Sequence, residues 1–159
     1  MIHSRTLASL MLAAFGALGG RPSTVSALPN PNDATVTSLS VVPRTGRADV
    51  VVRVAGAVTY KHFTLSKPDK IVLDLSGASL GLPEGDAYDG VARGGITRIR
   101  YSQFTKTVVR VVLTLDAAHP YTVSNENGEL RISVETALGE FEPWAIGETA
   151  RGDSDPLVF

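Results

Sequence analysis

One short stretch of the sequence has the spacing of a serine nucleophile. Gly77-Ala78-Ser79-Leu80-Gly81 fits the G-x-S-x-G pattern, and Asp86, Asp116 and His119 follow it in the order of a hydrolase triad. The pattern works when the serine sits on a sharp turn between a strand and a helix. Here a proline and several glycines follow, so no helix can form, and the chain is too short for an α/β-hydrolase. We therefore expect no serine catalysis.

Metal chemistry has equally little support. A hydrolytic zinc site needs His and acidic ligands in a fixed geometry. Beyond the N-terminal apolar segment the chain has two histidines, His62 and His119, and neither belongs to a helical His motif. Nothing marks a pair of carboxylates for glycosidase chemistry. The sequence predicts a protein that is not an enzyme and that carries no metal or cofactor.

The N-terminus has the features of a secretory signal peptide. A positive charge at Arg5 precedes an uncharged apolar run, and Val25-Ser26-Ala27 supplies the small or branched residues that signal peptidase reads. We expect residues 1–27 to be removed on export to the periplasm or cell envelope, and residues 28–34 to form a linker. The run is shorter than the roughly 20 residues of a membrane span, so we expect no transmembrane segment in the mature chain. Arg21 leaves a membrane anchor open as the alternative.

Composition narrows the class of partner. The chain has no cysteine, so the fold has neither disulfides nor a cysteine-linked lipid and must rely on its core. The formal net charge is −1, and aromatic residues make up only 6% of the chain. Nucleic-acid-binding surfaces usually show a clustered basic excess and stacking aromatic residues. Nucleic acid is therefore not an expected partner.

Segments rich in Val, Ile and Thr, separated by turn residues, indicate strands in both halves of the chain. In the first half these segments cover residues 35–42, 48–55, 58–65 and 71–75. The pattern repeats roughly 58 residues later, because Val51–Val54 corresponds to Val108–Val111, and Ile71–Leu75 corresponds to Leu130–Val134. Two such four-strand units packed face to face predict an all-β sandwich of two related, about four-stranded sheets.

The segments outside the repeats lack strand signals. Residues 76–95 are rich in glycine and are expected to form a crossover loop in which Tyr88 is exposed. After residue 135 the composition changes and shows no period, so residues 136–159 are expected to be a flexible linker or tail. The predicted domain therefore covers residues 35–135.

Strand alternation assigns the two faces of each strand. The residues expected to face the core are Ile71, Leu73, Leu75, Ile99, Tyr101, Val109, Val111, Leu113 and Leu115. The residues expected to face outward are Val72, Asp74, Arg98, Arg100, Ser102, Val108, Arg110, Val112 and Thr114. The outward faces thus carry several arginines and one acid.

The motifs on these strands together resemble the AMIN domain. The resemblance rests on Lys70–Ala78 (KIVLDLSGA), Ile99–Phe104 (IRYSQF) and Arg110–Leu113 (RVVL), and it covers residues 34–135. That family occurs before the catalytic domain of exported N-acetylmuramoyl-L-alanine amidases and near the N-terminus of type IV pilus secretins. The resemblance implies a sandwich of two related sheets. The sequence carries no amidase or secretin motif, which leaves a stand-alone module and a fragment both open.

The resemblance also implies localisation in the cell envelope through binding of peptidoglycan, which presents sugar hydroxyls, acetamido groups and stem-peptide carboxylates. Arginine forks match carboxylates, and a glutamine amide can pair with an acetamido group in both directions. The family motifs place the expected ligand-binding residues at Asp74, Arg100, Gln103 and Arg110. Alternation puts Gln103 on the inward side, so it reaches solvent only if the strand bulges or ends there.

Two alternatives stay open. The arginines could be ordinary outward side chains paired with Asp74, Asp116 or Glu135, and such surface pairs need no function. The module could also bind a pilus secretin or another envelope protein along an exposed strand edge, by β-augmentation, or be the targeting part of a cell-wall amidase.

Overall fold

A computed structural model describes residues 34–137 and 139–147, and this part of the chain is all-β, as predicted. No helix occurs among these residues, and hence none that is long and apolar enough to cross a membrane. The predicted signal peptide (1–27) and, apart from Ala34, the predicted linker (28–34) lie outside the described residues. The strands are β1 (Ala34–Arg44), β2 (Arg47–Ala55), β3 (Thr59–Leu65), β4 (Lys70–Ser76), β5 (Ala78–Leu80), β6 (Ile96–Thr105), β7 (Val108–Leu115), β8 (Tyr121–Glu126), β9 (Glu129–Glu135) and β10 (Trp144–Gly147).

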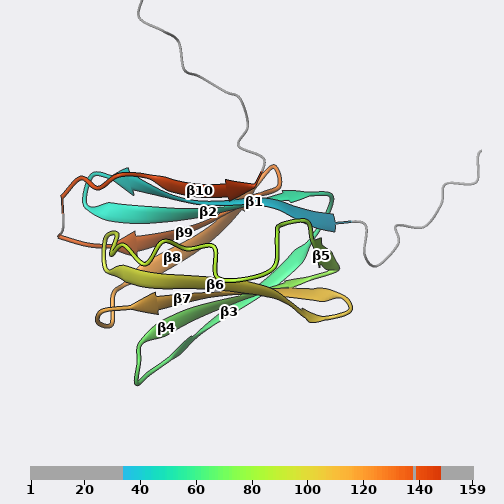
Figure 1. Cartoon of the computed structure of the whole chain (residues 1–159), viewed down its shortest axis with the longest axis horizontal. Helices are drawn as coiled ribbons and strands as arrows, with labels where there is room; N and C mark the ends of the chain where they lie inside the picture. Colours follow the sequence, from blue (N-terminus) through green and yellow to red (C-terminus); the bar gives the residue numbers. More distant parts are fainter. Residues whose placement is uncertain (1–33, 138, 148–159) are drawn as a thin grey trace, which may run out of the picture.

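The strands form two sheets that enclose one shared core (Figure 1). The six-stranded sheet has the order β10-β1-β2-β9-β8, with β5 paired to the start of β1. The four-stranded sheet has the order β3-β4-β7-β6. Neighbouring strands are antiparallel, except that β5 runs parallel to β1. The expected sandwich of two related sheets is confirmed.

We expected each copy of the repeat to form one sheet. Instead, each sheet contains strands from both copies. Each copy contributes one hairpin to each sheet: β1–β2 and β8–β9 lie in one, and β3–β4 and β6–β7 lie in the other. In the repeat, β1 to β4 correspond to β6 to β9, so exchanging the two copies turns the order β1-β2-β9-β8 into β6-β7-β4-β3, which is the strand order of the other sheet. Each copy is divided between the sheets because the chain crosses from one sheet to the other after β2 and again after β7. Neither copy therefore has a core of its own.

Alternation along the strands predicts the core correctly. The inward residues of β4, β6 and β7 are all buried, including Leu73, Tyr101, Val111 and Leu113. They pack in one cluster with the inward residues of β1, β2 and β9. Burial of these apolar side chains supplies the main driving force for folding, since the described part of the chain has no disulfide to assist it.

Two strands lie where no strand was predicted. β5 lies inside the expected crossover loop, at the point where Gly77, with a φ of +81°, turns the chain from β4 toward the other sheet. Three residues are too few to show a period in the sequence. β10 lies inside the segment expected to be a flexible tail, and it pairs with β1 while Trp144 and Ile146 pack against the core. The sandwich therefore extends beyond residue 135.

Truncating a core side chain tests this assignment. Leu113→Ala leaves a cavity between the sheets, and we expect the free energy of unfolding to fall by about 2–5 kcal/mol. Urea denaturation followed by circular dichroism measures the change. The control is Val91→Ala, which shortens a side chain that is 53% exposed in the crossover loop and should cost less than about 0.5 kcal/mol. Equal losses in both variants would contradict the core described here.

Candidate functional site

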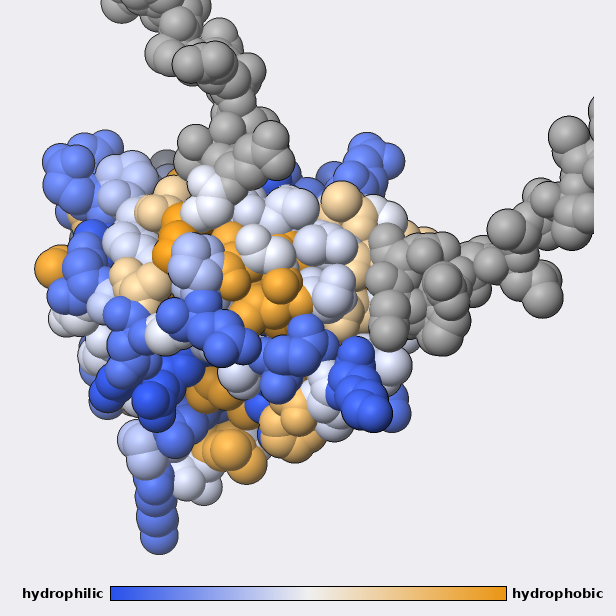
Figure 2. Space-filling view, turned by 45° about the vertical axis from the view of Figure 1, so that its right-hand side comes forward, coloured by the Kyte–Doolittle hydropathy of each residue, from blue (hydrophilic) through white to orange (hydrophobic). Residues whose placement is uncertain are grey.

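The outer face of the four-stranded sheet brings together most of the residues that the sequence singled out. Strand alternation and register place Asp74 on β4 directly opposite Arg110 on β7, with Arg100 on the neighbouring β6. The edge strand β3 adds Lys61 opposite Asp74 and Phe63 opposite Val72. Over this part of the molecule, apolar side chains reach the surface among charged ones (Figure 2). We call this outward surface of β3, β4, β7 and β6 the four-strand face.

The centre of the four-strand face is a two-pronged ion pair. Arg110 donates from Nε to Asp74 Oδ1 and from Nη2 to Asp74 Oδ2, both at 2.7 Å. Both side chains are partly buried, so the pair is more rigid than an ordinary surface ion pair. The hydrogen bond to Asp74 raises the pKa of Arg110 above its ordinary value. The Nη1 group has no hydrogen-bond partner among the described residues and remains available as a donor.

Two exposed phenylalanines flank this pair. The Arg110 guanidinium carbon lies 3.6 Å from the centre of the Phe104 ring and 5.9 Å from that of Phe63. Phe104 is 53% exposed and Phe63 is 40% exposed, which is unusual for large apolar side chains on a sheet with a charged centre. The arginine is thus held from two sides, by the Asp74 carboxylate and by cation–π contact with Phe104. Neither phenylalanine is among the site residues predicted from the sequence.

A β-bulge lies at Phe104, which strand alternation places on the outward side with Arg100 and Ser102. The register between β6 and β7 shifts between Gln103 and Thr105, so one residue of β6 is left unpaired. The same bulge decides the position of Gln103, whose amide is used within the protein. Its Oε1 accepts from the Leu80 backbone at 2.8 Å, and its Nε2 donates to the backbone oxygens of Ala78, Thr105 and Val108. Among the four predicted site residues, Gln103 therefore has a structural role, because its amide joins β5 to the end of β6.

Arg100 lies at the border of the four-strand face and is well exposed. Its Nε is 3.2 Å from Asp86 Oδ1, and Arg98 Nη2 is 2.5 Å from the other oxygen of Asp86. The hydrogen bond from Arg98, together with the charge of Arg100, holds the pKa of Asp86 below its ordinary value. Arg100, Asp86 and Ser102 line a shallow hollow beside the crossover loop. Arg100 therefore keeps donors free toward solvent.

The crossover loop is fastened by a buried arginine that the sequence interpretation missed. Arg93 donates through Nη1 and Nη2 to the two oxygens of Asp89, at 2.6 and 2.7 Å, and through Nε to the Glu142 backbone oxygen at 2.7 Å. Tyr88 was expected to be exposed, but it is buried edge-on against Trp144, with its ring centre 5.0 Å away. Tyr88 is buried because β10 covers the loop. Burial raises the pKa of Tyr88.

Ser79 and His119, which the sequence offers as members of a triad, each have a hydrogen-bond partner of their own. Ser79 Oγ donates to the Ala34 backbone oxygen at 3.2 Å, and His119 Nε2 lies 2.7 Å from Asp116 Oδ1. His62 contacts the Tyr121 hydroxyl at 3.1 Å, between the end strands of the two sheets. Within the described residues, no group of three or more His, Asp or Glu side chains lies close enough together to hold a metal ion.

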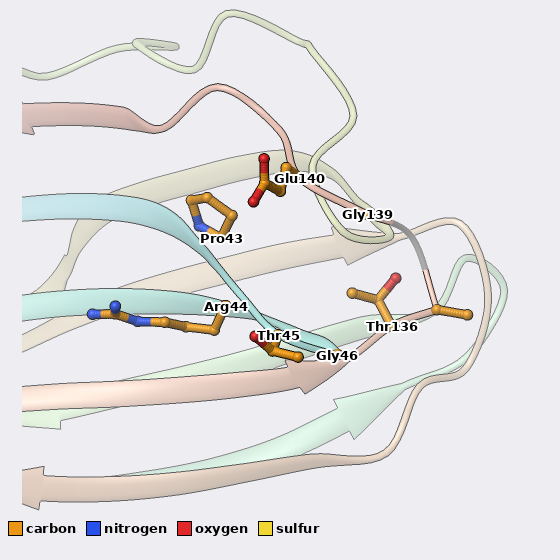
Figure 3. Close-up of a pocket in the computed structure, with 8 residues that line it drawn as sticks. Pro43, Arg44, Thr45, Gly46, Thr136, Gly139 and Glu140 are labelled. Carbon is orange, nitrogen blue, oxygen red and sulfur yellow. The ribbon is translucent and has the colours of Figure 1, made fainter.

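Another hollow lies at the end of the six-stranded sheet, between the β1–β2 turn and the segment after β9 (Figure 3). Pro43 and Glu140 stand on one side of it, and Gly46 and Thr136 stand on the other. The Arg44 side chain extends back along the sheet, away from Gly46. No sequence-predicted site residue lines this hollow.

The fold is a β-sandwich whose four-strand face exposes charged and aromatic side chains. The family model of the AMIN domain matches residues 38–136, which is more than half of the chain, and the chain belongs to this family. AMIN domains are non-catalytic modules of exported envelope proteins that serve in peptidoglycan binding and localisation. No curated protein matches the sequence significantly. The resemblance drawn from the strand motifs is thus confirmed.

The Asp89–Arg93 pair predicts a specific acid dependence. The hydrogen bonds from Arg93 lower the pKa of Asp89 from 3.8 to about 2, so the folded state resists protonation of this carboxyl. The stabilisation is complete above the ordinary pKa and is lost as the pH falls toward the folded value. We expect Asp89→Asn to lower the urea midpoint clearly at pH 5, and this deficit to shrink as the pH falls to about 2.

Glu84→Gln is the control for that experiment, because Glu84 is exposed and has no ion-pair partner within the described residues. Its effect on the urea midpoint should stay small at every pH. A deficit of Asp89→Asn that is equally large at both ends of the pH range would contradict the assigned pair.

Proposed function

We propose that this protein is a non-catalytic cell-envelope module that binds peptidoglycan through its four-strand face. Membership of the AMIN family supports the class of function. The observation that carries the choice of face is the Arg110 guanidinium, held by Asp74 and by the ring of Phe104 in the middle of an exposed surface. Ordinary surface arginines are not fixed from two directions, and fixing one in advance reduces the entropy lost on binding.

The chemistry of the face fits the groups that peptidoglycan offers. The free Nη1 of Arg110 and the exposed fork of Arg100 are donors for stem-peptide carboxylates or acetamido oxygens. Phe63 and Phe104 provide apolar surfaces against which the carbon-bound hydrogens of a sugar ring can pack. Asp74 acts here as a positioning residue, because both of its oxygens are already used by Arg110. Gln103 is left out of the proposed contacts, because its amide is occupied within the protein.

The site of action proposed for this binding is the periplasm or cell envelope. The N-terminal signal-peptide pattern predicts export, and the family occurs in exported proteins. An all-β domain without cysteines is suited to this compartment, since its stability does not depend on the redox state. Binding to the wall would keep the protein, and any domain joined to it, close to peptidoglycan.

A second candidate function is docking to a pilus secretin or another envelope protein. The observation that favours it is that β3 and β8, two of the four end strands of the sheets, each have another strand on one side alone. The two strands lie close together, because His62 of β3 contacts Tyr121 of β8. An extended segment of a partner could add to either edge by β-augmentation.

Co-sedimentation with purified sacculi tests the first proposal. We expect the wild-type protein to sediment with the sacculi, and Arg100→Ala combined with Arg110→Ala to lower the bound fraction by about tenfold, because charge-assisted contacts are lost. Phe104→Ala should lower it to a smaller extent. Circular dichroism and the urea midpoint of each variant establish that it is folded.

Arg53→Ala is the matched control. Arg53 corresponds to Arg110 in the duplication, but it lies on the outer face of the other sheet, where it is 3.6 Å from Glu129. Its replacement should leave sacculus binding unchanged. Wild-type protein that stays in solution with sacculi but is retained by a secretin would decide for the second candidate. A loss in Arg53→Ala as large as that in the Arg100→Ala, Arg110→Ala double variant would exclude the four-strand face.

A further inference from the structure

The outer face of the six-stranded sheet carries a charge arrangement that the proposed function does not use. Asp49 of β2 points outward, yet its side chain is completely buried. Three arginines cover it: Arg47 Nε lies 3.1 Å from Oδ1, while Arg131 Nη1 lies 2.9 Å and Arg44 Nε 3.8 Å from Oδ2. These arginines come from β1, β2 and β9, which are adjacent in the sheet. A carboxylate buried in this way is stable only while it stays paired.

The arginines of this cluster outnumber its acids. Arg131 also pairs with Glu129, and Arg53 reaches the same Glu129 from the other side at 3.6 Å. Four arginines thus share two carboxylates, and the surplus positive charge belongs to Arg44 and Arg47, which have no acidic partner besides Asp49 among the described residues. Glu135 lies opposite Arg47 in the strand register but forms no ion pair with it. Its carboxylate lowers the positive potential around Arg44 and Arg47.

The orientation of Arg44 and Arg47 leaves their binding ends free. Each contacts Asp49 through Nε, the inner nitrogen, so that the terminal Nη1 and Nη2 groups have no partner in the described part of the chain. The two side chains are 57% and 50% exposed. Figure 3 shows the Arg44 side chain lying back along the sheet, which carries its guanidinium toward Asp49. Asp49 is therefore a buried counter-charge for two guanidinium forks that the strand register places side by side, and its Oδ1 accepts no hydrogen bond.

We propose that Arg44 and Arg47 form a binding site for a phosphate group. Two separate forks can supply donors to three or four oxygens of a tetrahedral oxyanion, whereas a planar carboxylate is satisfied by one fork. The surplus positive charge matches the charge of a phosphate ester. The site lies on the sheet opposite the four-strand face, so it adds a second ligand to the module and does not depend on binding of peptidoglycan. The phosphate can belong to a lipid headgroup or to a soluble phosphate ester.

Titration with inorganic phosphate, followed by phosphorus NMR, tests the site without any peptidoglycan present. We expect Arg44→Gln combined with Arg47→Gln to weaken phosphate binding by about tenfold. The control is Lys67→Gln with Lys106→Gln, which removes the same charge from two exposed turn residues and should leave binding close to that of the wild type. Glu135→Gln should strengthen binding about twofold, because it removes the opposing carboxylate.

A second variant guards against loss of the fold. Arg44→Lys with Arg47→Lys keeps the charge that Asp49 needs but removes the forks, so we expect a normal urea midpoint with weaker phosphate binding. Flotation with phosphatidylcholine vesicles, with and without phosphatidylglycerol, separates the two sources. Retention by phosphatidylglycerol that inorganic phosphate competes away assigns the site to lipid headgroups, and phosphate binding without retention assigns it to soluble phosphate.

Three results would overturn the site. The first is a wild-type protein that does not bind phosphate, and the second is a glutamine or lysine double variant that binds it as tightly as the wild type. The third is an equal loss in the Lys67 and Lys106 control, which would show that net charge alone is responsible. None of these results bears on sacculus binding, which is measured through Arg110 on the opposite sheet.

Discussion

The structure depends on one apolar interior that two copies of the same strand pattern must build together. The central pairs of the two sheets, β2–β9 and β4–β7, both join the first copy to the second, so the backbone hydrogen bonds at the middle of each sheet connect residues far apart in the chain. Leu73 and Val111 are opposite one another in such a pair, and both are buried. Because each copy is divided between the sheets, burial of its apolar residues requires the other copy. We infer that folding is cooperative over the whole domain, since no smaller unit encloses a core.

This constraint on the inner faces also determines the outer ones. A residue next to a buried core position on a strand must face outward, and its neighbours on adjacent strands are set by the register. Asp74 thus meets Arg110 because Leu73 and Val111 are in the core. The exposed faces carry little of the stabilising burial and are free to vary in chemistry. The function of this domain therefore depends on the side chains at the outward positions of its strands.

The sequence predicts the features that depend on short-range alternation of apolar and polar residues. These are most of the strands, the core, and the outward positions of Asp74, Arg100 and Arg110. Alternation does not give the bulge after Gln103, which depends on how β6 meets β7. It places Phe104 outward, but it does not show that the ring packs against Arg110, so Phe104 was missed as part of the site. Arg93, Tyr88 and β10 were missed for a related reason: their burial arises from contacts between the crossover loop and residues 142–147. Such long-range contacts leave no periodic signal in either segment.

The duplication gives two sheets of the same strand order but not two equal surfaces. Arg53 and Arg110 are equivalent in the repeat, yet Arg110 forms a two-pronged pair with Asp74 at 2.7 Å, whereas Arg53 has a single, longer contact with Glu129. Aromatic rings surround the first arginine, while the other sheet concentrates its arginines around the buried Asp49. A scaffold whose stability lies in a shared interior can change each outer face separately. The two faces have accordingly diverged, one toward a rigid polar and aromatic surface and the other toward a dense positive charge.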